Sequence, residues 1–409
     1  MLFIKRIDSI FLLLLIFAPL FVVMIPGVLG IDYVYFTVPL KWGVLFISLF
    51  LIMRGLLNRS STIPLSSILF FICFFVIYLI RVLLDVYLYK VEMTFYSNSF
   101  DYIEGIVYCF LTSLSIIFLK RVDFEWVLKR GYLLYFIGIV LSVFISLVLS
   151  TDLVQRQEGR YEGTQGLTSL VYGHFGVSFA LLSLVLFGRT SNSIISKVFL
   201  LGCFLLGLFV MYLAGSRSPL LALVICSFFL FKDKVGYLKG IFILVFICAL
   251  FFVFSFQITE ILSGYGGTFF DRVQMAVEGG NSSGRDDIFK KGVDEFLANP
   301  LLGNAFLIQT WGIGRGIYPH NIIIESLMAT GILGGWLFLG WIFKSLRAGL
   351  RLFNTNSNLG WISIIYIQQV IFGMFSLSLF THDKFWNFSI LTVFAYHHIS
   401  KTKLDYGKG

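Results

Sequence analysis

Charged residues are scarce in this chain of 409 residues: only 13% are Asp, Glu, Lys or Arg, whereas 58% are hydrophobic. Soluble domains carry about 25% charged residues, so the composition excludes a soluble nucleotide enzyme and a disordered regulator. Repeated apolar runs of about 20 residues are long enough to cross the hydrocarbon core of a bilayer as helices. The sequence therefore predicts an all-α fold, that of a polytopic membrane protein.

Cysteine is also rare: five residues, each within an apolar run and none in a Cys-x-x-Cys pair. They indicate buried apolar side chains and exclude a disulfide scaffold. The chain lacks the glycine-rich loop that binds nucleotide phosphates, and it has no His-Glu-x-x-His or Cys/His cluster typical of zinc. We therefore expect no metal and no cofactor. In a membrane protein the net charge of +9 is typical of cytoplasmic loops, so we expect no nucleic-acid partner.

Hydropathy predicts about twelve transmembrane helices. Their approximate cores are residues 10–29, 34–53, 64–80, 101–119, 131–150, 168–187, 198–214, 218–231, 241–258, 321–343, 360–380 and 385–400. With the N-terminus inside, most Lys and Arg residues fall in cytoplasmic segments, so both termini are predicted to be cytoplasmic. The basic pair Lys5-Arg6 before the first run is similar to a signal peptide, but no small-residue cleavage site follows, so we expect a retained helix.

The spans predict three parts: residues 1–258 with nine helices, 259–320 as one large outer loop containing short helices, and 321–409 with three helices and a cytoplasmic tail. A loop of this length is uncommon and usually functional. The large loop is therefore the first place to look for a site.

Arginines on the outer side run against the topological bias, so each needs a local reason. Arg217 precedes Ser218-Pro219, which suit the N-cap and first position of a helix. A cation beside a helix N-terminus favours a bound anion such as phosphate. The alternative is an arginine that extends to the lipid headgroups. Arg160, Arg272, Arg285 and Arg315 are the other outer candidates.

Arg285 lies in the first turn of a predicted amphipathic helix over residues 283–297, where Ser283 and Asp286 resemble a capping box. The expected apolar face consists of Ile288, Phe289, Val293, Phe296 and Leu297. A ligand contact and a salt bridge to a nearby acid are both open for Arg285.

The stretch Tyr318-Pro319-His320-Asn321 closes the large loop. Pro319 disfavours helix before it, so His320 is predicted near a helix start at the membrane boundary. An unperturbed pKa near 6.5 suits histidine to general-base work, whereas the alternative is a structural histidine. Asn321 and Glu325 share a helix face and could orient substrate or helix. The competing outer histidines are His174 and His382.

These features together resemble the O-antigen polymerase/O-antigen ligase superfamily of bacterial envelope glycosyltransferases. The resemblance rests on the late large loop and on three local stretches: Ala214 to Pro219, Ser283 to Gly303, and Pro319-His320-Asn321 with Gly331 and Gly334. It implies a metal-independent, inverting transferase of the GT-C type. Such an enzyme transfers glycans from undecaprenyl diphosphate at the periplasmic face of the inner membrane.

The resemblance implies roles for the residues above. Arg217 and Arg285 would bind the diphosphate, since a guanidinium presents a planar donor fork to phosphate oxygens. His320 would deprotonate or orient the acceptor hydroxyl. The remaining substrate-binding candidates are Arg160, Tyr161, Arg272, Arg315, Tyr318, Asn321 and Glu325, with Tyr265 and Trp311 as further aromatics for sugars.

The Tyr-Pro-His-Asn stretch favours the polymerase branch, whose members usually work with a chain-length regulator. Two alternatives stay open: a ligase that transfers the glycan to lipid A–core, and a flippase or transporter of lipid-linked oligosaccharides. The expected partners are the lipid bilayer and an undecaprenyl-diphosphate-linked oligosaccharide.

Overall fold

The computed structural model describes residues 6–58, 61–96, 98–148, 155–156, 160–164, 167–189, 193–235, 285–312, 314–355 and 358–406. Within these ranges the regular structure is helical, apart from the short antiparallel pair β1 (Gln155–Arg156) and β2 (Arg160–Tyr161). The chain packs as two units. Unit 1 comprises Met1–Asp8, Val44–Val122 and Ser282–Gly409, and unit 2 comprises Ser9–Gly43 and Asp123–Asn281.

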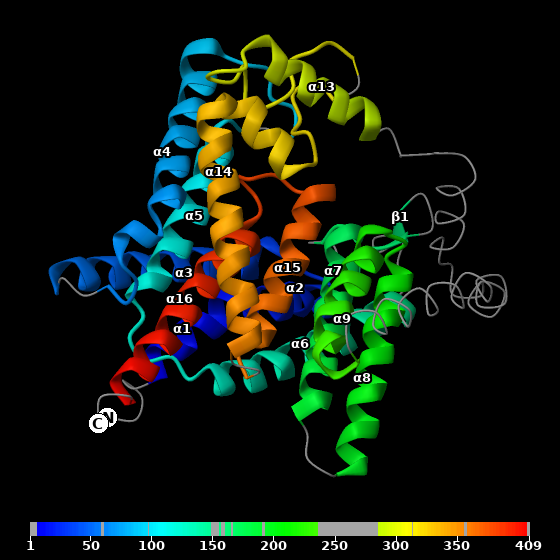
Figure 1. Ribbon diagram of the computed structural model, residues 1–409. Coiled ribbons are helices and arrows are strands. Elements are labelled where there is room, and N and C mark those ends of the chain that lie inside the picture. The colour runs from blue at the N-terminus through cyan, green and yellow to red at the C-terminus, as the bar shows by residue number, and fades with distance from the viewer. Residues whose placement is uncertain are drawn as a thin grey trace. The chain divides into compact units, whose positions relative to one another are not determined.

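Unit 1 is a bundle around α14 (Ile322–Thr355), which packs against α4 (Leu69–Leu83), α15 (Gly360–Phe375) and α16 (Asp383–Tyr406). The remaining elements are η2 (Leu65–Ser67), the π-helix η3 (Leu84–Tyr89), α5 (Phe100–Ser115), η4 (Ile116–Phe118) and α13 (Arg285–Ala298). Figure 1 shows α13 above α14, at the end of the bundle where α4 also ends, and the two helices are in contact. Aromatic rings from α4, α14 and α16 fill the centre of the bundle, with Phe74, Phe338 and Trp386 in mutual contact.

Unit 2 is built around α7 (Ser169–Arg189), which packs against α6 (Phe124–Leu147), α8 (Ile194–Leu213) and α9 (Ser218–Val235). Its other helices are most of α1 (Ile7–Ile16), α2 (Ala18–Leu29) and the first part of α3 (Val34–Leu57). Gly176 of α7 faces Gly207 of α8 so closely that a Cβ on either would lie 2.6 Å from the other's carbonyl oxygen. Small residues permit this approach, which is common between membrane helices.

Seven described helices are long and apolar enough to cross a membrane, and the pair α1 and α2, bent by 57°, is an eighth candidate. The prediction of a polytopic helical membrane protein is thereby confirmed. Every predicted core coincides with a helix or a bent pair of helices except 241–258, which lies outside the described residues. The number twelve, the cytoplasmic termini and the division at residues 258 and 320 stay predictions.

The helix α14 is broken at Gly331, where φ is 63° and ψ is −163°. A side chain could not be accommodated there, because its Cβ would clash with the carbonyl oxygen of Leu301. The backbone N–H of Ile332 donates to the Pro300 oxygen at 2.8 Å, and that of Asn304 donates to the Met328 oxygen at 2.9 Å. Loop backbone therefore satisfies groups that the break would otherwise leave unpaired.

The two segments of α14 point in different directions (Figure 1). The second segment follows α4 antiparallel, with Phe338 against Phe74 and the Lys344 ammonium bonded to the Ser66 oxygen. If α14 continued straight from its second segment back toward its N-terminus, Glu325 would lie past the end of α4. Glu325 instead accepts a hydrogen bond from Tyr78 in the middle of α4. The first segment therefore folds back into the bundle and carries His320 inward with it.

Candidate functional site

The helix α13 begins at Arg285, within the predicted amphipathic stretch. Its buried face differs from the predicted one: Ile288, Gly292 and Glu295 are buried, whereas Val293 and Leu297 are exposed. Gly292 and the hydrogen-bonded Glu295 occupy this face because α13 packs very closely on α14. A Cβ on Gly292 would lie 2.7 Å from the Ile324 side chain and 3.0 Å from Pro319.

His320 lies under α13 at the turn that leads into α14. Its φ of 55° is in the left-handed region, which few residues other than glycine adopt. The imidazole is half-buried and meets the Tyr318 ring edge-to-face at 4.5 Å between centroids. Within the described part of the chain, its Nδ1 atom is buried and makes no hydrogen bond. A strained backbone conformation and a buried ring nitrogen without a hydrogen bond are both typical of functional sites.

The charge of Arg285 acts on both His320 and Tyr318. Burial lowers the pKa of His320 to about 4, and the positive charge of Arg285 contributes in the same direction. Burial raises the pKa of Tyr318, and Arg285 opposes that rise. At neutral pH, His320 is therefore an uncharged imidazole able to accept a proton, and it lies within the electrostatic reach of a guanidinium.

Asn321 and Glu325 hold the start of α14. The Asn321 side chain accepts hydrogen bonds from the backbone N–H groups of Ile323 and Ile324 and donates to the Met374 oxygen. It is the N-cap that a helix start requires. The buried Glu325 carboxylate accepts from the Tyr78 hydroxyl at 2.6 Å and from the Leu379 N–H at 3.0 Å. These contacts favour the helix-orienting role that the sequence had left open.

Arg315 is engaged with its own surroundings. Its guanidinium makes an ion pair with Glu92 at 2.9 Å and lies over the Trp311 ring at 3.6 Å from the centroid. The hydroxyl of Thr94 donates to the Arg315 carbonyl oxygen. The residue thus ties the α13–α14 loop (residues 299–321) to the segment after η3, and its contact with substrate stays a prediction.

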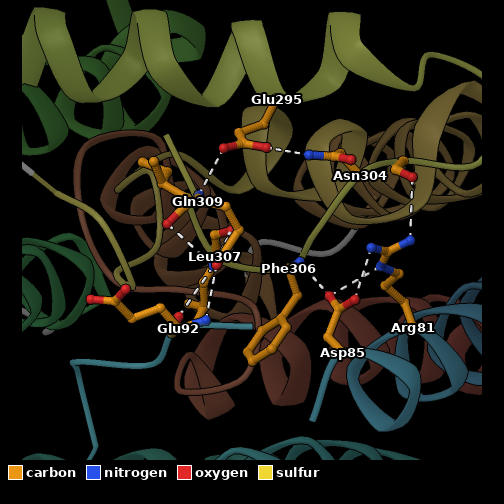
Figure 2. Close-up of polar contacts among 10 residues, drawn as sticks. Arg81, Asp85, Glu92, Glu295, Asn304, Phe306, Leu307 and Gln309 are labelled. Atoms are coloured by element: carbon orange, nitrogen blue, oxygen red, sulfur yellow. Dashed lines mark hydrogen bonds and ion pairs between the residues drawn. The ribbon is translucent and has the colours of Figure 1, made fainter. Parts of the chain in front are cut away.

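A polar network that the sequence did not predict holds the α13–α14 loop in place (Figure 2). The Glu295 carboxylate accepts from the backbone of Gln309 and Thr310 and from the Asn304 amide. The Gln309 side chain in turn pairs with the backbone of Glu92. The sequence signal for this network was the acidic residue Glu295 in an amphipathic helix, because a carboxylate that is buried against the protein needs several hydrogen-bond partners.

The same loop is bonded to the end of α4. Arg81 and Asp85 form an ion pair at 2.8 Å, and Asp85 accepts from the Phe306 N–H while Arg81 donates to the Gly303 oxygen (Figure 2). Two opposite charges spaced i,i+4 at the end of an apolar run were a sequence signal for this pair. Their role is to fix the loop that carries His320.

Gly292→Ala is expected to damage the site although alanine favours helix. The new methyl group would push α13 away from Pro319 and Ile324, and overpacking of this kind costs about 1–3 kcal/mol. A displacement of Arg285 relative to His320 by about 1 Å would reduce activity up to about 100-fold. The measurement is turnover together with thermal unfolding of the purified protein.

The matched control is Asp294→Ala, at an exposed position of the same helix, which should leave turnover unchanged. A Gly292→Ala protein with full activity would show that the spacing of α13 and α14 does not matter for the site.

Arg217 lies in unit 2 beside the start of α9, as predicted. Its carbonyl oxygen accepts from the N–H groups of Leu220 and Leu221, so Arg217 itself occupies the capping position. The predicted N-cap, Ser218, is instead the first helical residue, and its hydroxyl bonds His174 of α7 at 3.2 Å. His174 and also His382, whose Nε2 bonds the Gln369 oxygen, are thus held by internal hydrogen bonds.

The other predicted residues are less fully described. Arg160 and Tyr161 form β2 in unit 2, paired with Arg156 and Gln155. Arg272 and Tyr265 lie outside the described residues. Among the side chains that the structure describes, no group of three or more His, Cys, Asp or Glu residues could hold a metal ion.

Fold and site define a polytopic helical membrane protein with a histidine–arginine site beneath a loop helix. Residues 202–339, about a third of the chain, match the family model described as O-antigen ligase, a range that contains Arg217, Arg285 and His320. No curated protein matches the chain. The match supports the O-antigen ligase/polymerase superfamily and a glycosyltransferase-type function, and it does not distinguish a polymerase from a ligase.

Proposed function

We propose that this protein is an O-antigen polymerase that transfers an undecaprenyl-diphosphate-linked glycan onto the next lipid-linked repeat unit. The observation that carries the proposal is the buried Nδ1 atom of His320, which makes no hydrogen bond within the described part of the chain and lies within the range of the family match. The Arg285 charge helps to lower the pKa of this histidine. We place the reaction at the periplasmic face of the bacterial inner membrane, with both termini cytoplasmic.

The reaction needs a base and a cationic site. A hydroxyl of the acceptor sugar attacks the anomeric carbon of the donor, a new glycosidic bond forms, and the bond to the lipid diphosphate breaks. His320 accepts the hydroxyl proton. Arg285 stabilises the charge on the departing diphosphate, as preorganised cations can do without a metal. Arg217, for which the sequence predicts the same role, belongs to unit 2, and its part in binding the diphosphate stays a prediction.

Other residues of the site orient the His320 ring and the acceptor. Asn321 and Glu325 fix the start of α14 and hence the direction of the His320 ring. Tyr318 packs against that ring. Arg160 and Tyr161 would position the acceptor, with Arg272 and Arg315 as weaker contacts to substrate.

The electrostatic effect of Arg285 on His320 links binding to catalysis. In the free protein the arginine charge helps to keep the pKa of His320 low. A diphosphate bound to Arg285 offsets that charge, which raises the pKa of His320 and makes it a stronger base when substrate is present. The site therefore gains basicity when the donor is in place.

The pH dependence of kcat/KM follows from the lowered pKa of His320. Because His320 stays neutral down to about pH 4, kcat/KM is expected to hold level from neutral pH to about pH 5 and to fall near pH 4. In Arg285→Ala one of the two causes of the low pKa is gone, so this fall should move to higher pH. Initial rates over a pH series test this, with circular dichroism at each pH to confirm folding. A fall centred near 6.5 would contradict the assignment of His320 as the buried base.

A ligase is the second candidate, because the family model that matches is described as O-antigen ligase. It would use the same donor and the same residues, with lipid A–core as acceptor. A flippase is the more distant alternative, and it should tolerate loss of a base.

Purified protein in liposomes, supplied with the host's undecaprenyl-diphosphate-linked repeat unit alone, tests the proposal. A ladder of lengthening glycans on a gel supports a polymerase. Glycan transfer that occurs only after addition of lipid A–core identifies a ligase. No transfer to either acceptor, in protein that is folded and inserted, would overturn both readings.

A further inference from the structure

The turn between α13 and α14 exposes apolar side chains beside the α14 break. Leu301 and Leu302 are each 60% exposed. They continue a stripe of exposed apolar side chains on the second segment of α14, formed by Ile332, Trp336, Leu339 and Phe343. This spacing places the stripe on one helix face, as expected for a surface in contact with lipid. The turn and the helix therefore both expose apolar side chains where their backbones are bonded to each other.

The backbone of this turn is already bonded within the protein. The oxygens of Pro300 and Leu301 accept from Ile332 and Leu333, and the Gly303 N–H donates to the Asn299 oxygen. The Gly303 oxygen accepts from Arg81. Non-helical backbone at membrane depth requires such internal bonding, because hydrocarbon supplies no partners. A water-exposed turn has no such need.

The length of the second α14 segment gives a third argument. From Gly331 to the exposed Arg347 the helix rises about 24 Å, at about 1.5 Å per residue. The hydrocarbon core is about 30 Å thick, so the part of this segment that precedes the exposed Arg347 is shorter than the core. The remaining thickness on this side has to be filled by what precedes Gly331. The turn bonded to Ile332 and Leu333 lies at that depth.

We propose that the turn at residues 299–303 is inserted in the bilayer, with Leu301 and Leu302 in contact with lipid acyl chains of the leaflet on the side of the α13–α14 loop. The turn that closes the α14 break then also anchors the α13–α14 loop in hydrocarbon. The anchor fixes the depth of α13 and of His320 relative to the lipid headgroups.

Spin labels measure this directly in the full-length protein in liposomes. The five native cysteines are replaced by alanine, and a nitroxide is attached at Leu302→Cys. Phe343→Cys on the lipid-facing stripe and Lys290→Cys on the exposed face of α13 are the matched references. The readout is collision with oxygen, which concentrates in lipid, and with a water-soluble nickel chelate.

The Leu302 label is expected to behave like the Phe343 label, with high accessibility to oxygen and low accessibility to nickel. Nickel accessibility equal to that of the Lys290 label would show a water-exposed turn and overturn the proposal. Low accessibility to both reagents would also overturn it, because protein would then cover the turn. Leu302 is exposed, so the label should leave the packing unchanged.

Discussion

Replacement of His320 by alanine is expected to lower kcat for glycan transfer by about 10²–10⁴-fold, the usual contribution of a positioned general base. The loss should appear mainly in kcat, because the diphosphate contacts of the arginines remain. The ring packs on Tyr318 and its buried Nδ1 makes no hydrogen bond within the described part of the chain, so folding should change little. The measurement is the rate of glycan lengthening, together with the thermal unfolding temperature.

His398→Ala is the matched control, since this histidine lies on α16, far along the chain from the loop, and packs on Phe394. It should retain full activity. A His320→Ala protein that still lengthens glycans at the normal rate would keep the polymerase and remove His320 as its base.

Arg285→Ala is expected to lower activity by about 10²–10³-fold, the range found when one donor to a developing negative charge is removed. The arginine acts on the leaving diphosphate, so binding of the lipid-linked donor should also weaken. Transfer rates over a series of donor concentrations separate the two effects. The pH profile supplies an independent readout through His320.

Lys290→Ala removes an equal charge from an exposed position of α13 and should leave turnover near that of the native protein. Arg285→Lys should recover part of the activity, because an ammonium keeps the charge and loses the planar fork. Equal losses in Lys290→Ala and Arg285→Ala would indicate a general effect of charge and contradict a specific phosphate site.

Hydropathy predicted the described helices well, because about 20 apolar residues in sequence have few other solutions in a bilayer. It could not predict the break at Gly331, which depends on loop residues 300–304 bonding to α14 from outside the helix. The buried face of α13 was also predicted incompletely. Helical periodicity selected Val293 and Leu297, whereas the close approach of Pro319 and Ile324 favours Gly292.

For the site, sequence reasoning placed Arg285 and His320 on one loop, and the charge of Arg285 helps to lower the pKa of His320. The helix-orienting option for Asn321 and Glu325 came from their shared face, but their partners Met374, Tyr78 and Leu379 lie far away in the sequence. The network of Arg81, Asp85 and Glu295 was missed for the same reason. Each of these residues acts on the loop through contacts that no local pattern encodes.

His320, as the base for the acceptor hydroxyl, and Arg285, as the cation for the departing diphosphate, act in one transfer step. The most direct test compares single-turnover release of undecaprenyl diphosphate by the native protein, His320→Ala, Arg285→Ala and the double variant. Residues that act as one unit show strongly non-additive losses, so the double variant should be little slower than the slower single variant. Losses that multiply across the two substitutions would contradict a shared site.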